Sequence, residues 1–298
     1  MGQDVSKATI LVEALPYIQR FSGKTVVIKY GGHAMVDESL KNSFAQDIVL
    51  MKYVGIHPVI VHGGGPQISR TMERMGIHPT FVEGQRVTDS ETMNVVEMVL
   101  VGTVNKEIVG LVNRHGGRAV GLSGRDGDLI QAEQMKIYKY AGDERPPEII
   151  DIGRVGRVGR VNSPVLRALE SAGFVPVIAP VGVGPDGMAY NINADLVAGA
   201  IAAEIKAERL ILLTDVPGVM RTGDDGTSEL IPSMDVAAVR RAIEDGTARG
   251  GMLPKLKACL KAVEGGVSKA HVVDGRRAHA ILLELFTDAG VGTEIVGE

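Results

Sequence analysis

The sequence predicts an α/β protein built on a largely parallel β-sheet that helices cover on both faces. Short runs of consecutive apolar, mostly β-branched residues recur along the chain, and most lead through glycine into a helical pattern. Strands that are apolar throughout are typical of sheets buried on both faces, and regular alternation with helices indicates parallel neighbours.

The expected strands lie at residues 24–32, 57–65, 117–124, 174–182, 208–219 and 270–275, and helical patterns lie at residues 37–55, 66–76, 191–205 and 249–266. Ligands of such sheets bind beyond the carboxyl ends of the strands, which is where these glycines fall. We therefore expect the functional site at that edge of the sheet.

Two stretches interrupt the alternation. Residues 134–162 contain a Pro-Pro turn and a tandem Gly-Arg-Val, and they predict a β-hairpin excursion. Its Arg154, Arg157 and Arg160 can either bind an anion or form a solvated strand face, and the second interpretation is the simpler one. Residues 220–234 are polar and glycine-rich, and they predict a surface loop.

A helix is predicted over residues 8–23, ahead of the first strand. Its apolar stripe has helical spacing, Gly23 is a suitable stop, and Pro16 is expected to kink it. The stripe can pack on the core of its own chain or against another subunit, and periodicity does not separate the two. The stripe consists of Ile10, Leu11, Ala14, Leu15, Ile18 and Phe21.

Composition excludes several classes of function. The net charge of −4 and the absence of tryptophan argue against a nucleic-acid-binding protein. The single cysteine, Cys259, is most simply interpreted as a small apolar residue of a helix. No spacing of Cys or His residues indicates a metal site. No membrane-spanning run or signal peptide is recognisable, so we expect a cytoplasmic protein.

Two glycine turns suggest an anion site. Lys29 closes a buried strand two residues before Gly31 and Gly32, and an ammonium there is costly to bury unless an anion meets it. Gly63, Gly64 and Gly65 follow the next strand, and Pro66 suits the first helical position. Free N–H groups and a helix dipole would then point at the ligand, although a turn without a ligand uses similar residues.

Further polar residues stand at helix starts and turns. Asn191, Asn193 and Asp195 precede an alanine-rich helix and can act as caps or hold lysines. Lys255 lies in the first turn of another helix, where a cation is disfavoured without an external anion. Arg86 follows a glycine turn and can pair with a carboxylate. A solvent-exposed side chain is the simpler alternative for Lys255 and Arg86.

Together, two lysines, two glycine turns and one aspartate are suited to stabilising a phosphoryl group in transfer. No Ser/His/Asp or Cys/His arrangement is recognisable. A carboxylate acceptor is ionised at neutral pH and needs no general base.

The segments "VIKYGG", "VIVHGGGPQI", "RVT", "NINAD", "LLTDVPGV" and "GGMLPKLKA" resemble the amino acid kinase family in type and order. The resemblance implies a three-layer αβα sandwich and the transfer of phosphate from ATP to the side-chain carboxylate of N-acetyl-L-glutamate, the second step of arginine biosynthesis. It also implies a helical arm at residues 1–24, a lobe for the amino-acid substrate at 25–190 and an ATP lobe at 191–298.

The same resemblance implies a role for each matching residue. Lys29 and Lys255 would stabilise the transferring group, with Asp195 organising both. Mg²⁺ would be held mainly by the nucleotide phosphates, without a metal site of the protein's own. The substrate would be bound by Gly64, Gly65, Arg86 and Asn191, and ATP by Gly31, Gly32, Asp215, Val216, Pro217, Gly218, Val219 and Met220.

The two ends of the chain resemble the arginine-inhibited branch of the family. That branch implies allosteric inhibition by L-arginine, a hexamer built as a trimer of dimers through the N-terminal helix, and a PII-type regulatory protein as a further partner. The implied arginine-site residues are Tyr17, His271, Glu284, Gly290 and Gly292.

Other functions stay open at this point. Glutamate 5-kinase, carbamate kinase, uridylate kinase and aspartokinase share the implied scaffold, although the pairing of "VHGGGPQI" with "RVT" favours acetylglutamate. A non-catalytic arginine sensor would be expected to lack a catalytic lysine, and both are present. Neither glycine turn fits the fingerprint of a nicotinamide-dependent dehydrogenase.

Overall fold

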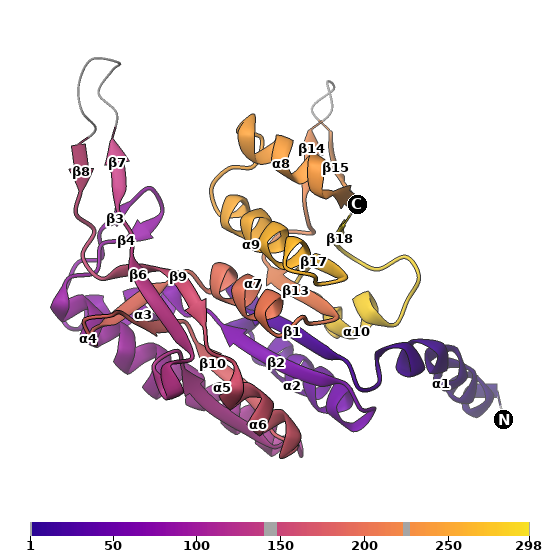
Figure 1. Ribbon diagram of the computed structural model, residues 1–298. Coiled ribbons are helices and arrows are strands. Elements are labelled where there is room, and N and C mark those ends of the chain that lie inside the picture. Colours follow the sequence, from indigo (N-terminus) through magenta and orange to yellow (C-terminus); the bar gives the residue numbers. More distant parts are fainter. Residues whose placement is uncertain (1, 140–147, 223–226, 298) are drawn as a thin grey trace.

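The computed structural model describes residues 2–139, 148–222 and 227–297, and the expected sheet lies at its centre (Figure 1). All neighbouring strands are parallel except the pair β17–β18. No helix within the described ranges is long and apolar enough to cross a membrane. In sheet order the strands are β16 (Ser233–Asp235), β18 (Thr293–Val296), β17 (Lys269–Asp274), β13 (Arg209–Thr214), β1 (Thr25–Tyr30), β2 (His57–His62), β10 (Val175–Ala179) and β5 (Ala119–Ser123).

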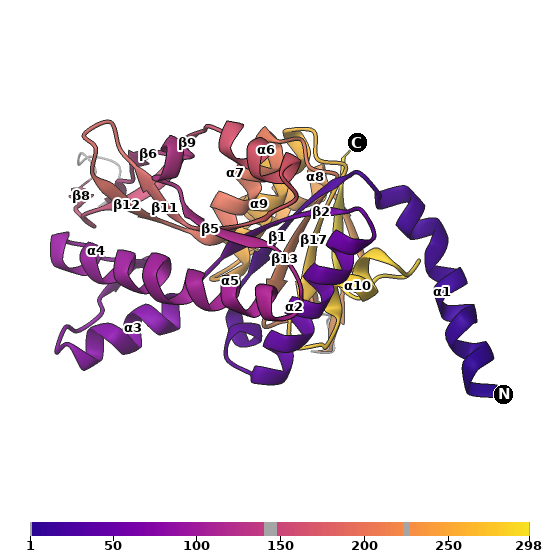
Figure 2. The same ribbon diagram turned by 90° about the horizontal axis from the view of Figure 1, so that it is seen from below.

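Helices cover both faces, which confirms the three-layer sandwich (Figure 2). One face carries α2 (Glu38–Tyr53), α5 (Asn105–Arg114) and α10 (Ala280–Leu285). The other carries α6 (Pro164–Ser171), α7 (Ala194–Glu204), α8 (Val236–Glu244) and α9 (Met252–Glu264). Each face has its own buried apolar cluster, so the sheet separates two cores.

Strand alternation assigns the side chains at the ends of β1 and β2 to opposite faces. Val26 and Ile28 belong to the core beneath α2, whereas Val27 belongs to the core beneath α7. Lys29 therefore points toward α7. By the same period, His62 follows Ile60 toward the face of α5.

A small closed barrel stands beside the main sheet, and the sequence did not predict it. It contains β6 (Ile130–Gln134), β9 (Val155–Val161), β11 (Val181–Val183) and β12 (Ala189–Ile192). The single strand predicted at 174–182 is wrong, because the chain passes from β10 into β11 at Pro180 and enters the barrel.

The hairpin excursion is confirmed in β7 (Ile137–Lys139) and β8 (Glu148–Ile150), whereas its Pro-Pro turn lies outside the described residues. Arg157 and Arg160 are exposed, and Arg157 pairs with Glu133 across the barrel. Arg154 donates to Ser90 Oγ at 3.0 Å. A solvated face therefore describes Arg157 and Arg160.

The loop prediction for residues 220–234 is wrong in part. β14 (Met220–Thr222) pairs antiparallel with β15 (Ser228–Leu230), and β16 then joins the main sheet. Residues 223–226 lie outside the described part of the chain.

The N-terminal helix α1 (Gly2–Phe21) projects from the body (Figure 2). Ile10, Leu11 and Leu15 are exposed, and among residues 9–21, whose side chains the structure describes, Tyr17 and Phe21 belong to the core beneath α2 or pack against it. Half of the six stripe residues are therefore exposed, whereas Ala14 and Ile18 are half-buried and Phe21 is buried. Pro16 lies within the helix, which continues to Phe21.

Close packing of α7 on α9 depends on Gly199. A Cβ at this position would lie 2.6 Å from the carbonyl oxygen of Ala258 in α9. Because the obstacle is backbone, a side chain can be accommodated only by moving one helix away from the other. Asp195 and Lys255 stand at the starts of these two helices, so this contact also affects the distance between them.

We expect Gly199→Ala to lower the free energy of unfolding by about 1–3 kcal/mol, because α7 and α9 must separate. The matched control is Gly110→Ala in α5, where the nearest atom to a new Cβ is Arg114 Nη1 at 3.6 Å. That change should stabilise the protein by about 0.5–1 kcal/mol, as expected of glycine replacement within a helix. Urea unfolding of both variants measures the difference, and a stabilised Gly199→Ala would contradict the packing account.

Candidate active site

The carboxyl ends of β1 and β2 border a cavity of about 230 Å³. The structure brings the predicted substrate residues and two of the three predicted catalytic residues together there, whereas the third, Lys255, does not line the cavity and contacts Asp195 at its border. Its wall also contains Ile68, Phe81 and Leu100, which the sequence analysis did not identify. The predicted residues that line it are Lys29, Gly64, Gly65, Arg86, Asn191 and Asp195.

Asp195 joins the two predicted lysines. Its Oδ1 lies 3.0 Å from Lys29 Nζ, and its Oδ2 accepts a hydrogen bond of 2.9 Å from Lys255 Nζ. The Lys255 contact also has hydrogen-bond geometry, whereas the Lys29 contact is an ion pair by distance. The three side chains are 10%, 5% and 12% exposed for Lys29, Asp195 and Lys255.

Three different elements hold this group. Lys29 comes from β1, Asp195 from the first turn of α7 and Lys255 from the start of α9. Asn193 caps α7, because its Oδ1 accepts the backbone N–H groups of Asp195 and Leu196 at 2.9 and 3.2 Å. The cap fixes the turn that carries the carboxylate.

The charge balance of the group favours an anionic ligand. Burial opposes ionisation of Asp195, but the two nearby ammonium groups outweigh it and hold the pKa of its carboxyl below its usual range. Two lysines against one carboxylate leave one positive charge in a largely buried place. A phosphoryl group can offset that charge.

The first glycine turn lies beside Lys29. A Cβ on Gly31 would come within 2.6 Å of Lys29 Nζ, so glycine leaves the ammonium its space. Gly32 begins the short helix η1 (Gly32–Met35), and a Cβ at this position would overlap the Asp215 carboxylate. The same carboxylate accepts the His33 N–H at 2.5 Å. Asp215 thereby connects the ends of β1 and β13.

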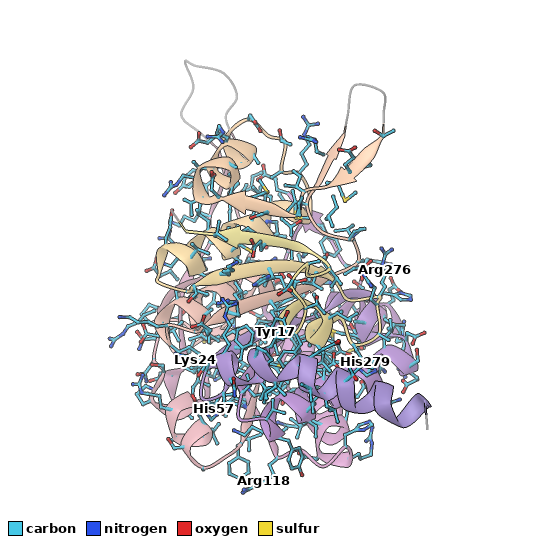
Figure 3. All side chains as sticks on the ribbon, turned by 90° about the vertical axis from the view of Figure 1, so that its right-hand side faces the viewer. Tyr17, Lys24, His57, Arg118, Arg276 and His279 are labelled. Carbon is cyan, nitrogen blue, oxygen red and sulfur yellow. The ribbon has the colours of Figure 1, made fainter. Side chains whose placement is uncertain are left out.

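The remaining residues of the predicted nucleotide segment differ in their exposure to solvent. Val216 and Pro217 are exposed, whereas Gly218 and Val219 are buried, and the Val219 N–H donates to Thr293 Oγ1 at 2.9 Å. None of the predicted nucleotide residues lines the 230 Å³ cavity. Arg276, which the sequence analysis missed, stands beyond β17 and pairs with Asp274 (Figure 3).

Arg86 is a buried cation in the cavity wall. It lies in β4 (Gln85–Arg86), is 7% exposed, and stacks over the Phe81 ring at 4.8 Å. Its guanidinium donates to Ser69 Oγ at 2.8 Å and to the Gly65 carbonyl at 3.1 Å. It forms no ion pair within the described residues, so a ligand carboxylate would supply the missing charge.

Asn191 shares a short hydrogen-bond chain with the Arg86 strand. Its Nδ2 donates to Thr88 Oγ1 at 3.4 Å, and that hydroxyl donates to the Arg86 carbonyl at 2.7 Å. The barrel strand β12 is thus connected to the wall that carries Arg86.

The second glycine turn leads into α3 (Gly65–Arg74). Gly63 donates to the Tyr30 carbonyl at 2.8 Å, which ties the turn to β1. A Cβ on Gly64 would meet Leu100 Cδ2 at 2.5 Å. Leu100 belongs to the π-helical segment η2 (Met98–Val104), which joins α4 (Ser90–Glu97) to α5.

A second cavity, of about 260 Å³, lies between the end of α1 and the C-terminal strands. All five predicted arginine-site residues line it. Tyr17 donates to Asp288 Oδ1 at 2.6 Å, and His271 Nδ1 lies 2.7 Å from Glu284 Oε1 (Figure 3). Acidic and basic side chains both face this cavity, among them Glu294 and Lys269.

Metal-binding clusters of three or more His, Cys, Asp or Glu side chains are absent from residues 2–139, 148–222 and 227–297. The Asp195 carboxylate already contacts two lysines.

Comparison with known proteins agrees with this geometry. The profile of the Amino acid kinase family matches residues 24–274, so the chain belongs to that family. Acetylglutamate kinase from Syntrophobacter fumaroxidans is 62% identical to it over 98% of this chain and 97% of that protein. Acetylglutamate kinase from Desulfotalea psychrophila is 60% identical over 98% of each.

A solved structure shares the fold. N-acetylglutamate synthase from Neisseria gonorrhoeae, solved with coenzyme A and N-acetyl-glutamate, has a TM-score of 0.80 and 25% identity. The match covers 98% of this chain and 63% of that longer protein.

Proposed function

We propose that this amino acid kinase phosphorylates the side-chain carboxylate of N-acetyl-L-glutamate with ATP, giving N-acetyl-L-glutamyl 5-phosphate and ADP in arginine biosynthesis. The observation that carries the proposal is the Lys29–Asp195–Lys255 group at one end of a cavity whose wall holds the unpaired Arg86. The acetylglutamate kinases at about 60% identity support the same acceptor.

The reaction needs charge stabilisation rather than acid–base chemistry. An oxygen of the acceptor carboxylate forms a bond to the γ-phosphorus, and the bond from that phosphorus to the β,γ-bridging oxygen breaks, leaving ADP. The acceptor is already ionised, so no proton has to be removed. Lys29 and Lys255 approach the transferring group from β1 and α9, and they offset the charge on its oxygens.

Each end of the acceptor has a suitable partner in the cavity. Arg86 can hold the α-carboxylate in a bidentate pair, and Asn191 can contact the remaining polar groups. Gly64 and Gly65 can donate backbone N–H groups near the reacting carboxylate, since α3 begins there. An acceptor without an α-carboxylate would leave Arg86 unpaired, which argues against carbamate.

ATP would lie beyond the lysines, along Gly31, Gly32 and the segment Asp215, Val216, Pro217, Gly218, Val219 and Met220. Mg²⁺ would neutralise charge on the phosphates when bound, and the phosphates would supply most of its ligands. Residues 25–190 would form the lobe for the amino acid and residues 191–298 the lobe for ATP. A cytoplasmic location fits this role.

We expect hydroxylamine trapping of the acyl phosphate to detect ATP-dependent turnover with N-acetyl-L-glutamate and little with glutamate, aspartate, carbamate or UMP. Lys29→Ala and Lys255→Ala should each lower kcat by about 100-fold or more, because each removes charge stabilisation from the transferring group.

Lys257→Ala is the matched control, because Lys257 lies in the same helix as Lys255 and is exposed. Circular dichroism should show that all three variants fold. A preference for another acceptor would contradict the proposed substrate, and near-normal turnover in either lysine variant would contradict the proposed roles.

We further propose that L-arginine inhibits the enzyme from the cavity beside α1. Tyr17, His271, Glu284, Gly290 and Gly292 line it, and Glu284 Oε2 accepts the N–H groups of Val291 and Gly292 at 2.6 and 3.1 Å. Its carboxylates suit a guanidinium and its cations suit a carboxylate. An inhibitor that contacts both α1 and the C-terminal segment would favour one placement of the helix.

The exposed stripe of α1 supports assembly through the same helix. Ile10, Leu11 and Leu15 would be buried against a second copy, giving a hexamer built as a trimer of dimers. A PII-type regulatory protein remains a candidate partner of that assembly.

We expect arginine to inhibit turnover, and Glu284→Gln to weaken that inhibition by about tenfold or more, because one charge-assisted contact is lost. Asp186→Asn, an exposed change on a barrel turn, should leave inhibition unchanged. Light scattering on the same samples should give a mass several times that of one 31.6 kDa chain. Full activity at saturating arginine would contradict the proposal that this cavity binds arginine as an inhibitor.

A further inference from the structure

His62 is a buried histidine at the end of β2 with no exposed surface and no contact with the lysine group. It faces α5, on the side of the sheet opposite Lys29. Burial lowers its pKa to about 4, so the imidazole is neutral at physiological pH. The reaction proposed above gives this side chain no task.

Its two ring nitrogens have different partners. Nδ1 lies 2.8 Å from the carbonyl oxygen of Gly63, and Nε2 lies 3.2 Å from Asn105 Nδ2. A carbonyl can only accept, so Nδ1 carries the proton. An amide nitrogen can only donate, so Nε2 is the acceptor.

The orientation of Asn105 is fixed in turn. Its Nδ2 donates one hydrogen to the Val177 carbonyl at 2.8 Å, and the other is shared between His62 Nε2 and the Leu122 carbonyl at 3.2 and 3.3 Å. Its Oδ1 accepts from Lys106 Nζ at 3.0 Å. A reversed amide would place oxygen against those carbonyls and nitrogen against an ammonium. Gly121 leaves the amide its room, since a Cβ there would overlap Asn105 Oδ1.

The Gly63 carbonyl belongs to the same peptide unit as the Gly64 N–H. In a planar trans peptide these two groups point in opposite directions, and the chain has no cis peptide among its described residues. Holding the carbonyl toward His62 therefore turns the Gly64 N–H away from α5. Gly64 lines the substrate cavity, as does Lys29, which points to the face opposite α5.

We propose that His62 is a positioning residue, whose Nδ1–H holds the Gly63 carbonyl so that the Gly64 N–H points at the reacting group, with Asn105 and Lys106 setting its tautomer. The role depends on the proposed function, because Gly64 is taken to contact the acceptor or the transferring oxygens. The π-helical segment η2 also restricts this glycine turn. It places Leu100 next to Gly64, and it ends immediately before Asn105.

Two substitutions separate the two ring nitrogens. In His62→Asn the amide Nδ2 stands as many bonds from the backbone as Nδ1 and can still donate to the Gly63 carbonyl. In His62→Gln the amide stands where Nε2 was and can still meet Asn105, but no donor remains near Gly63. His62→Asn removes more of the buried ring than His62→Gln, so it should lower the melting temperature at least as much.

We expect His62→Gln to lower kcat by about 10- to 100-fold, with the KM for ATP changed by less than about threefold, because only an interaction with the transferring group is misdirected. His62→Asn should retain at least about tenfold more kcat than His62→Gln. Equal losses of kcat in the two variants would mean that His62 only fills the core, and would overturn the proposal.

Two further measurements keep the outcome clear. If His62→Gln does not fold, Lys106→Met decides, because Lys106 is exposed and its loss removes the ammonium that holds Asn105 Oδ1. The amide is then held only from its Nδ2 side, so its hydrogen bond to His62 Nε2 should weaken. A several-fold fall in kcat is expected, and an unchanged kcat would overturn the proposal. A crystal structure of a folded His62 variant gives an answer that does not need turnover. The Gly63–Gly64 peptide should be rotated in His62→Gln and unrotated in His62→Asn, and an unrotated peptide in His62→Gln refutes the positioning role. An inactive wild-type enzyme would instead refute the proposed acceptor.

Discussion

The contact on which the site depends is the Asp195 carboxylate shared by Lys29 and Lys255. Two largely buried ammonium groups repel one another and lose hydration, and the carboxylate between them offsets this cost. The central strand β1, the capped start of α7 and the start of α9 all converge on this point. The close approach at Gly199 keeps the last two elements at the necessary distance.

The two faces of the sheet carry different parts of the site. Strand alternation sends Lys29 to the face of α7 and α9, and His62 to the face of α5. The charged group that meets the phosphoryl oxygens therefore lies on one side. The neutral hydrogen-bond chain behind the glycine turn lies on the other, and α5 and its preceding π-helical segment keep it out of water.

Much of this arrangement was predictable from the sequence. The strand ends and the glycine turns were recognisable from composition, and Lys29 and Lys255 because each places a cation where it is locally disfavoured. Asp195 has an ordinary residue type for a helix start, and its role came from the family resemblance. Arg86 was predicted as a carboxylate partner, and its burial without an ion pair fits that role. The small barrel was not predictable, because β11 and β12 have only three and four residues and β10 runs into β11 across a single proline. The roles of Asn105 and Gly199 were not recognisable in the sequence, because each depends on contacts with residues distant in sequence, His62 and Ala258.

The most direct test of the central claim compares kcat for Asp195→Asn, Lys255→Ala and the double variant, measured by acyl-phosphate trapping. If Asp195 acts by organising the lysines, the double variant should be about as slow as the slower single variant, because residues that work as a unit lose their effect together. Losses that multiply in the double variant would show that Asp195 and Lys255 act independently, and would contradict the account.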